Sequence, residues 1–222
     1  MYGAVDLHDC WGVDTVIAGA LTDEQLRALA EATLPNGQPV KFLWMYVPLS
    51  GNRASHWDAS ADRMRAACDA GLIVMLVQHC RSGLWTASAE LGQADGEEAG
   101  VYASDLGYPT DAYIALDDES VANTGKPVTD HLVAWCEAVK FAGRPCIYEG
   151  FSPGLSPSGL YGIPNVDRYW GAAGPWNVDK RGVCCRQFYP PVKVAGIVCD
   201  MDHAFPDKLG GTLRGMGRID AE

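Results

Sequence analysis

The sequence predicts an α/β fold, a closed TIM-like (β/α) barrel of eight strands with helices mainly in the first five connections. Short apolar runs alternate with segments of helical periodicity along most of the chain. Near-continuous apolar strands separated by helices are typical of a parallel sheet that is covered on its faces. An open, doubly wound sheet is the alternative architecture.

Eight segments have the length and composition of strands. They are Val13–Ala18, Phe42–Val47, Leu72–His79, Ala112–Leu116, Pro145–Glu149, Asp167–Gly171, Val183–Phe188 and Val194–Cys199.

Four segments between these strands have helical patterns. They are Thr22–Leu34, Ser60–Ala70, Ala87–Leu106 and Thr129–Ala142. Thr22 and Gln25 have the spacing of a capping box, in which each side chain binds the other residue's backbone N–H. A glycine follows three of the helices, and glycine most easily adopts the left-handed conformation that ends a helix. After Tyr148 the connections are too short or too rich in glycine and proline for full helices, so the last strands should follow one another closely.

Length and composition favour one domain over residues 1–222, because 222 residues with 48% hydrophobic content can bury one sizeable core. The longest apolar runs are far shorter than the roughly 20 residues that cross a bilayer, so no membrane span is expected. The N-terminus lacks a basic region followed by a long apolar stretch, which predicts no signal peptide. We therefore expect a protein that is cytoplasmic at synthesis unless a phage lysis system, a virion or an injection apparatus delivers it to the cell wall.

The net charge of −11 disfavours nucleic acid as a partner, because phosphate binding needs clustered lysine and arginine. The eight cysteines lie mostly in apolar runs and are expected to be free thiols, although their even number leaves one or two disulfides open. His79 and Cys80 are neighbours on one strand and should point in opposite directions, so they do not form a nucleophile and base pair. Standard zinc motifs are absent, and we predict neither a metal site nor an organic cofactor. The oligomeric state stays open.

The strongest chemical signal is the segment Asp117, Asp118, Glu119 at the end of the fourth predicted strand. Side chains alternate along a strand, so Asp117 and Glu119 share one side and Asp118 takes the other. Functional groups of parallel barrels lie at the C-terminal ends of the strands. Two carboxyl groups at that mouth suit glycosidic cleavage, which needs an acid and an assisting carboxylate. The alternative interpretation of this segment is a solvated acidic turn without a catalytic role.

Other strand ends add polar and aromatic groups to the same predicted mouth. Asp14 belongs to the first strand, Asp200 and Asp202 follow the last, and barrel closure would make those two strands neighbours. Tyrosine, tryptophan and glutamine side chains suit the apolar faces and hydroxyls of sugars, and as a set they favour a saccharide groove over core packing. The predicted substrate-binding residues are Asp200, Tyr46, Gln78, Tyr148, Trp170 and Gln187.

Five short motifs occur in order along almost the whole chain. They are GVDT at 12–15, ALDDE at 115–119, PCIYEGF at 145–151, CRQF at 185–188 and VCDMD at 198–202. The set resembles the glycoside-hydrolase-like domain of unknown function that is related to family 25 lysozymes. This resemblance implies a barrel of eight strands and about five helices, and cleavage of the β-1,4 bond between N-acetylmuramic acid and N-acetylglucosamine in peptidoglycan.

The resemblance also implies residue roles. Glu119 would be the general acid, Asp117 would assist the substrate acetamido group or the cation, and Asp14 and Asp200 would orient substrate and tune charge. The chain departs from the family's pattern in two places: VQHCRSG at 77–83 replaces a tyrosine-centred motif, and Asp118 replaces an apolar residue. Two hypotheses follow, an N-acetylmuramidase-like hydrolase and a catalytically inactive carbohydrate-binding or structural module, for example of a phage particle or injection apparatus.

Overall fold

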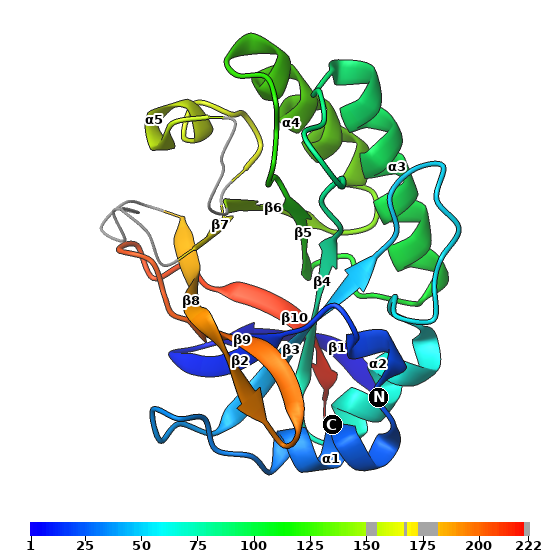
Figure 1. Cartoon of the computed structure of the whole chain (residues 1–222), viewed down its shortest axis with the longest axis vertical. Coiled ribbons are helices and arrows are strands. Elements are labelled where there is room, and N and C mark those ends of the chain that lie inside the picture. Colours follow the sequence, from blue (N-terminus) through cyan, green and yellow to red (C-terminus); the bar gives the residue numbers. More distant parts are fainter. Residues whose placement is uncertain (150–154, 167, 173–181, 220–222) are drawn as a thin grey trace.

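A closed barrel of eight strands organises the protein. The computed structural model describes residues 1–149, 155–166, 168–172 and 182–219 (Figure 1). Its strands are β1 (Tyr2–Leu7), β2 (Cys10–Asp14), β3 (Val40–Val47), β4 (Ile73–Gln78), β5 (Tyr113–Asp117), β6 (Arg144–Glu149), β7 (Arg168–Gly171), β8 (Val183–Val194), β9 (Ile197–Ala204) and β10 (Leu213–Arg218). Strands β2 to β9 form the ring, because β4 pairs with both β3 and β5. The predicted closed α/β barrel is therefore confirmed.

The barrel is mixed and not all-parallel. Strands β2 to β8 run parallel around the ring, whereas β9 is antiparallel to both of its neighbours, β8 and β2. Outside the ring, β10 pairs with β4 and β1 pairs with β10, both antiparallel. The sequence did not predict β1 or β10, because neither has a long apolar run.

The predicted last strand, Val194–Cys199, is wrong. It spans a hairpin turn at Ala195 and Gly196, both of which have positive φ, and β8 ends before this turn while β9 starts after it. Apolar residues on both sides of a two-residue turn look like one run in the sequence. The first predicted strand is also displaced, since β2 ends at Asp14. Asp167 of the sixth predicted strand lies outside the described residues.

The helices lie in the connections between the first six strands of the ring. They are η1 (Ala18–Ala20), α1 (Asp23–Ala30), α2 (Ala61–Asp69), α3 (Ala89–Asp105), α4 (Lys126–Val139) and the single turn α5 (Pro157–Leu160). The capping box of α1 is present, with the Gln25 N–H donating to Thr22 Oγ1 at 3.2 Å and the Thr22 N–H donating to Gln25 Oε1 at 2.9 Å. Gly71 and Gly107 have the predicted left-handed φ. Gly143 does not, and its lack of a side chain instead makes room for Ile114, which a Cβ would approach to 2.7 Å.

Side-chain alternation divides the core into two layers. On β3, Phe42, Trp44 and Tyr46 point into the barrel, whereas Leu43 and Met45 pack in the layer between the strands and the helices. The interior is filled mainly by aromatic and sulfur-containing side chains, and the Trp44 and Trp170 rings stack at 4.3 Å between centroids. Large interior side chains close the barrel below its mouth, so the site above it has a solid floor.

Helices α3 and α4 pack closely because a row of glycines on α3 faces α4. A Cβ on Gly92 would lie 2.1 Å from the backbone oxygen of His131, and one on Gly96 would lie 2.6 Å from that of Trp135. Gly100 makes room for the ring of Phe141, just beyond the end of α4, which a Cβ would approach to 2.7 Å. The glycines cost α3 some intrinsic helical stability, roughly 1 kcal/mol each, and the close packing offsets that cost.

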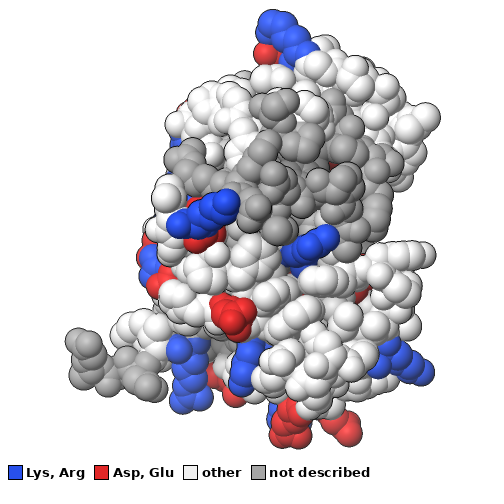
Figure 2. Space-filling model, turned by 90° about the vertical axis from the view of Figure 1, so that its left-hand side faces the viewer, with Lys and Arg blue, Asp and Glu red and all other residues white. Residues whose placement is uncertain are grey.

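The described residues include no helix long and apolar enough to cross a membrane. On the face drawn in Figure 2, lysines and arginines stand singly among neutral side chains, with acidic residues between them. That face therefore shows no continuous basic patch among the described residues.

We expect Gly92→Ala to destabilise the protein by about 2 kcal/mol, because the added methyl group meets backbone that cannot rotate away. This loss should exceed the intrinsic helical advantage of alanine. Urea unfolding followed by circular dichroism measures it. Gln93→Ala is the control, since Gln93 is exposed on the next position of α3 and should change stability by less than about 0.5 kcal/mol. Equal stabilities of the two variants would contradict the close-packing argument.

Candidate active site

A pocket of about 340 Å³ opens at one end of the barrel. Its walls are Asp14, Thr15, Val16, Tyr46, Asp117, Glu119, Tyr148, Gln187, Tyr189, Pro191, Val198, Cys199 and Asp200. These residues come from β2, β3, β5, β6, β8 and β9 or from positions just beyond their ends. The structure thus brings together the carboxyl groups of Asp14, Asp117, Glu119 and Asp200, which come from three separate stretches of the sequence.

Strand alternation decides which acids after β5 face the pocket. Tyr113 and Ala115 point into the barrel, so Asp117 and Glu119 continue that side and line the pocket. Asp118 takes the opposite side and is fully buried, and neither of its carboxyl oxygens has a hydrogen-bond partner among the described residues. The predicted division of this acidic triplet is confirmed.

Asp200 reaches the pocket for a different reason from the predicted one. It does not follow the C-terminal end of the last strand but lies within β9, which is antiparallel to β2 and places Asp200 directly opposite Asp14. Asp202 is opposite Gly12, one step deeper in the barrel. Residues two apart on one strand share a face, so both acids point toward the centre of the ring.

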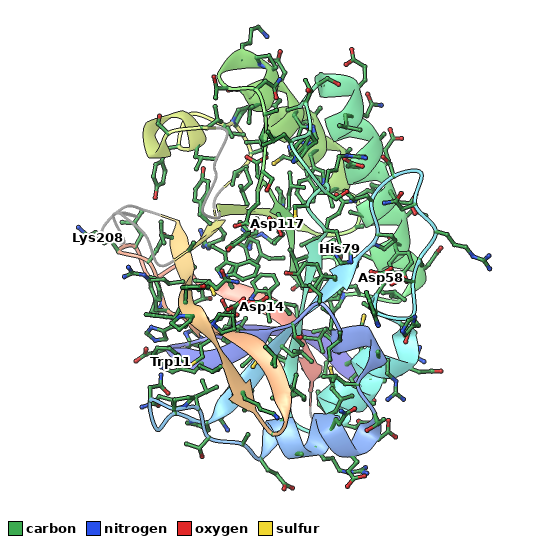
Figure 3. All side chains as sticks on the ribbon, viewed as in Figure 1. Trp11, Asp14, Asp58, His79, Asp117 and Lys208 are labelled. Atoms are coloured by element: carbon green, nitrogen blue, oxygen red, sulfur yellow. The ribbon has the colours of Figure 1, made fainter. Side chains whose placement is uncertain are left out.

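A chain of hydrogen bonds orients Asp14, which is labelled in Figure 3 together with Asp117. Gln187 Nε2 donates to Asp14 Oδ2 at 2.7 Å, and the Tyr148 hydroxyl donates to Gln187 Oε1 at 2.5 Å. The Tyr46 hydroxyl donates to Asp14 Oδ1 over a longer 3.5 Å. These side chains are all at least nine-tenths buried, so the network has little freedom to rearrange and presents Asp14 in one orientation.

Burial dominates the protonation of this end of the barrel. It raises the pKa of Asp14 to about 6, although the hydrogen bond from Gln187 acts in the opposite direction. The pKa of Asp202 is raised well above its usual range, again by burial first and then by the charge of Asp14. The Trp170 indole N–H donates to Asp202 Oδ1 at 2.9 Å, while Asp14 ionises close to neutrality.

Burial also affects the protonation of Asp117, which lies beside Glu119. Burial raises the pKa of Asp117 well above its usual range, and the nearby charge of Glu119 raises it further. Two carboxyl groups this close repel each other when both are ionised, which favours a proton on Asp117. The backbone at Glu119 is fixed by the Trp85 indole N–H, which donates to the Glu119 carbonyl oxygen at 2.8 Å.

Two predicted substrate-binding residues do not line the pocket. Gln78 is completely buried: its Nε2 donates to the carbonyls of Pro48 and Asp95, and its Oε1 accepts from the Trp135 indole at 2.6 Å. Trp170 lies under the pocket, within 4.2 Å of the Tyr148 ring between centroids. Both side chains support the barrel and its helices, because their polar atoms are already bonded to protein groups.

The structure also places near the pocket two groups that sequence reasoning missed. The Cys80 sulfur lies within 4.8 Å of a carboxyl oxygen of Asp117. His79 Nε2 contacts Asp58 Oδ1 at 2.8 Å, and its ring stacks on Tyr46. The segment 77–83 had already been singled out as unusual, but only strand order reveals that β4 lies beside β5. None of the eight cysteines forms a disulfide bond, as predicted for most of them.

Residues 35–210 match the Rv2525c-like, glycoside hydrolase-like domain. The chain belongs to this family. The match covers most of the barrel and includes Asp117, Glu119 and Asp200, although not Asp14. The family resemblance inferred from the five motifs is confirmed, and the domain is glycoside hydrolase-like. A search of curated proteins gives no significant match.

Solved structures similar to this domain include family 25 hydrolases. An uncharacterized protein of B. stearothermophilus has a TM-score of 0.65 at 16% identity, covering 88% of this chain and 95% of that one. The catalytic domain of endolysin ply40 from bacteriophage P40 of Listeria monocytogenes has a TM-score of 0.59 at 12% identity, and the match covers 90% of this chain and 95% of that one. GHIP, a glycosyl hydrolase 25 of Streptococcus pneumoniae, has a TM-score of 0.55 at 12% identity, and the match covers 89% of this chain and 88% of that one. At these identities the similarity establishes the fold alone.

We expect Gln187→Met to raise the pKa of Asp14 by about one unit above its value of about 6, because the variant loses a short hydrogen bond to the ionised form. Tyr46→Phe should raise it less, since its bond is 3.5 Å long. Carbon-13 NMR titration of the aspartate carboxyl groups measures both shifts, with Asp14→Asn as the assignment control. An unchanged midpoint in Gln187→Met would contradict the proposed network.

We expect the buried Asp118 to make stability fall as pH rises. Its pKa is raised to about 8 by burial, whereas an aspartate in the unfolded chain ionises near 3.9. Between these values the folded state holds a proton that the unfolded state lacks, so the free energy of unfolding decreases with increasing pH.

Asp118→Asn should remove this pH dependence. As the pH rises from 5 to 8, the free energy of unfolding of the variant should increase by at least about 1 kcal/mol relative to that of wild type. Urea unfolding at both pH values measures the gain. Asp105→Asn, an exposed change at the end of α3, is the charge-matched control and should follow wild type. Parallel curves for Asp118→Asn and wild type would show that Asp118 is already ionised in the folded protein.

Proposed function

We propose that this protein is an N-acetylmuramidase that hydrolyses the β-1,4 bond between N-acetylmuramic acid and N-acetylglucosamine in bacterial peptidoglycan. The observation that carries the proposal is the convergence of Asp14, Asp117, Glu119 and Asp200 on one pocket at the barrel mouth. Family membership and the fold shared with family 25 hydrolases support it. The pocket volume of about 340 Å³ is at the small end of the usual range of roughly 300–1,000 Å³, and suits a short stretch of a longer glycan.

Glu119 is the proposed general acid because it is half-buried at the pocket wall, closer to solvent than Asp117. Its proton would pass to the glycosidic oxygen as the bond from that oxygen to the anomeric carbon breaks. Asp117 would assist the acetamido group, or stabilise the positive charge that develops on the sugar. Water would then add to the anomeric carbon and return a proton to Glu119, so that hydrolysis leaves the enzyme unchanged.

Asp14 and Asp200 would orient substrate and tune the charge at the other side of the pocket. Asp14 is fixed by Gln187 and Tyr46, and a carboxylate with limited freedom accepts hydrogen bonds from sugar hydroxyls at little entropic cost. The tyrosine rings of the wall offer apolar surface for the sugar C–H groups.

The substrate lies outside the cytoplasmic membrane, so a muramidase has to be carried to it. Delivery by a phage lysis system, a virion or an injection apparatus would meet this requirement. The phage endolysin among the similar structures is compatible with such a route.

We expect Glu119→Gln to reduce the release of new reducing ends from purified peptidoglycan by at least about 100-fold, because general acid catalysis typically contributes 10²–10⁴-fold. Asp117→Asn should also lower the rate. Glu24→Gln on α1 is the matched control, since Glu24 is exposed and lies outside the pocket. The assay should cover pH 4 to 8. No release by wild type over that range, or full activity in Glu119→Gln, would contradict the proposal.

A catalytically inactive carbohydrate-binding module is the second candidate. The observation in its favour is the altered segment after β4, which brings the Cys80 sulfur within 4.8 Å of carboxyl oxygens of Asp117 and Glu119. Under this hypothesis wild type and Glu119→Gln bind insoluble peptidoglycan equally and neither releases reducing ends. A measurable turnover that Glu119→Gln abolishes would eliminate it.

A further inference from the structure

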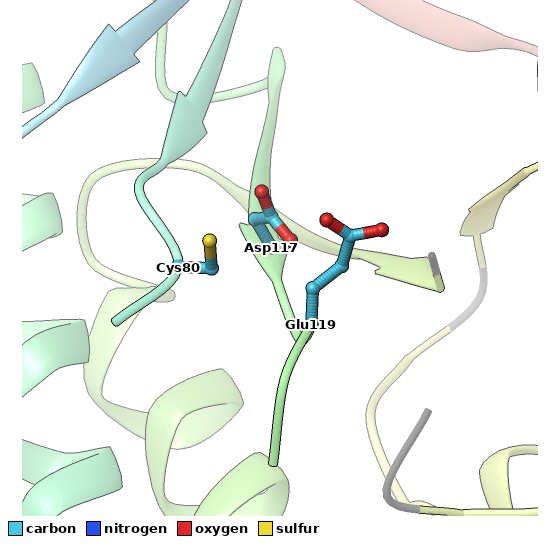
Figure 4. A group of neighbouring side chains, drawn as sticks. All are labelled: Cys80, Asp117 and Glu119. Atoms are coloured by element: carbon cyan, nitrogen blue, oxygen red, sulfur yellow. The ribbon is translucent and has the colours of Figure 1, made fainter. Parts of the chain in front are cut away.

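Three potential metal-binding side chains meet at the wall between β4 and β5. They are Cys80, Asp117 and Glu119, and one ligand atom from each lies within 4.8 Å of the other two (Figure 4). Cys80 follows the end of β4 and the two acids belong to the end of β5, which is hydrogen-bonded to β4. In Figure 4 the carboxyl groups and the thiol point toward a common space.

A buried polar atom aimed into this cluster points to a ligand. Asp117 is 5% exposed, and its Oδ1 has no hydrogen-bond partner in the described part of the chain. An unsatisfied buried carboxyl oxygen is costly. A cation between the three groups would satisfy it and would reduce the repulsion between the two carboxylates.

The donor set indicates which cation fits. Thiolate sulfur together with carboxylate oxygens suits Zn²⁺, whereas Mg²⁺ and Ca²⁺ prefer oxygen alone. Metal–ligand distances of about 2.0–2.3 Å place the ligands of a tetrahedral Zn²⁺ roughly 3–4 Å from one another. The three side chains therefore need to close by only about an ångström, and a water molecule would complete the tetrahedron.

Contacts of the neighbouring residue His79 help to position the β4 side of the cluster. His79, next to Cys80, contacts Asp58 at 2.8 Å and stacks on Tyr46 at 4.5 Å between ring centroids. Cys80 also lines a second pocket, of about 380 Å³, which shares none of its lining residues with the first. A small ion could reach the thiol from that pocket.

We propose that Cys80, Asp117 and Glu119 bind one Zn²⁺ ion, and that the bound ion inhibits the glycosidase. The inhibitory part rests on the proposed muramidase function, because the ion would occupy the carboxylate of the general acid. Binding proceeds with the thiol and carboxyl groups deprotonated, and their protons pass to solvent. The metal site itself does not depend on turnover.

Binding is tested on the full chain with Co²⁺ and Zn²⁺. We expect one ion per chain by isothermal titration calorimetry, and a sulfur-to-metal charge-transfer band with Co²⁺. Cys80→Ser should remove the band and weaken binding by at least about tenfold. Asp117→Asn should weaken binding by a similar factor. Cys10→Ser is the control, because Cys10 is the other partly exposed thiol. The metal site is overturned if the band is absent, or if both variants bind as wild type does.

Inhibition is tested separately with each variant's metal-free rate as its own reference. Zn²⁺ should slow the release of reducing ends by wild type, and a chelator should restore the rate. For Cys80→Ser, the ratio of the rate with Zn²⁺ to the metal-free rate should stay near one. Binding without inhibition would overturn the inhibitory role. Binding by a protein with no metal-free turnover would support the metal site and overturn both the muramidase function and its inhibition.

Discussion

The antiparallel pairing of β9 with β2 is the constraint on which the site depends. It closes the ring of strands and puts Asp200 opposite Asp14. The hairpin that joins β8 to β9 also brings Gln187 to the same place, where it donates to Asp14. A parallel last strand would carry its polar residues to other levels of the barrel. One side of the pocket therefore exists because the chain reverses direction once before closing.

Low dielectric at the barrel mouth decides the chemistry of the acids gathered there. Burial is the first cause of the raised pKa of Asp14, Asp117, Asp200 and Asp202. Repulsion from a neighbouring carboxyl group adds to it in each case, from Glu119 in the case of Asp200. Carboxyl groups with a raised pKa keep their protons to a higher pH than isolated ones, and donation to a leaving group needs such a proton. The same repulsion makes the cluster a favourable place for a cation.

The packing of aromatic side chains inside the barrel links fold and site. Trp170 stacks on Trp44 beneath the pocket and packs against Tyr148 in the pocket wall. Trp170 donates a hydrogen bond to Asp202, and Tyr148 donates one to Gln187. The floor of the pocket thus holds the polar layer above it. On the outer side, the glycine face of α3 lets α4 pack closely, which supports the strands that carry Asp117 and Tyr148.

The sequence by itself determined the closed barrel, most strands and the inward direction of Asp117 and Glu119, because apolar periodicity and side-chain alternation are local properties. Those local patterns also revealed the capping box at Thr22. Tertiary structure alone decided that β9 is antiparallel, that Gln78 is buried against Trp135, and that Cys80 lies beside Asp117 and Glu119. These facts depend on which strands become neighbours, and strand order is set by contacts between residues distant in the chain.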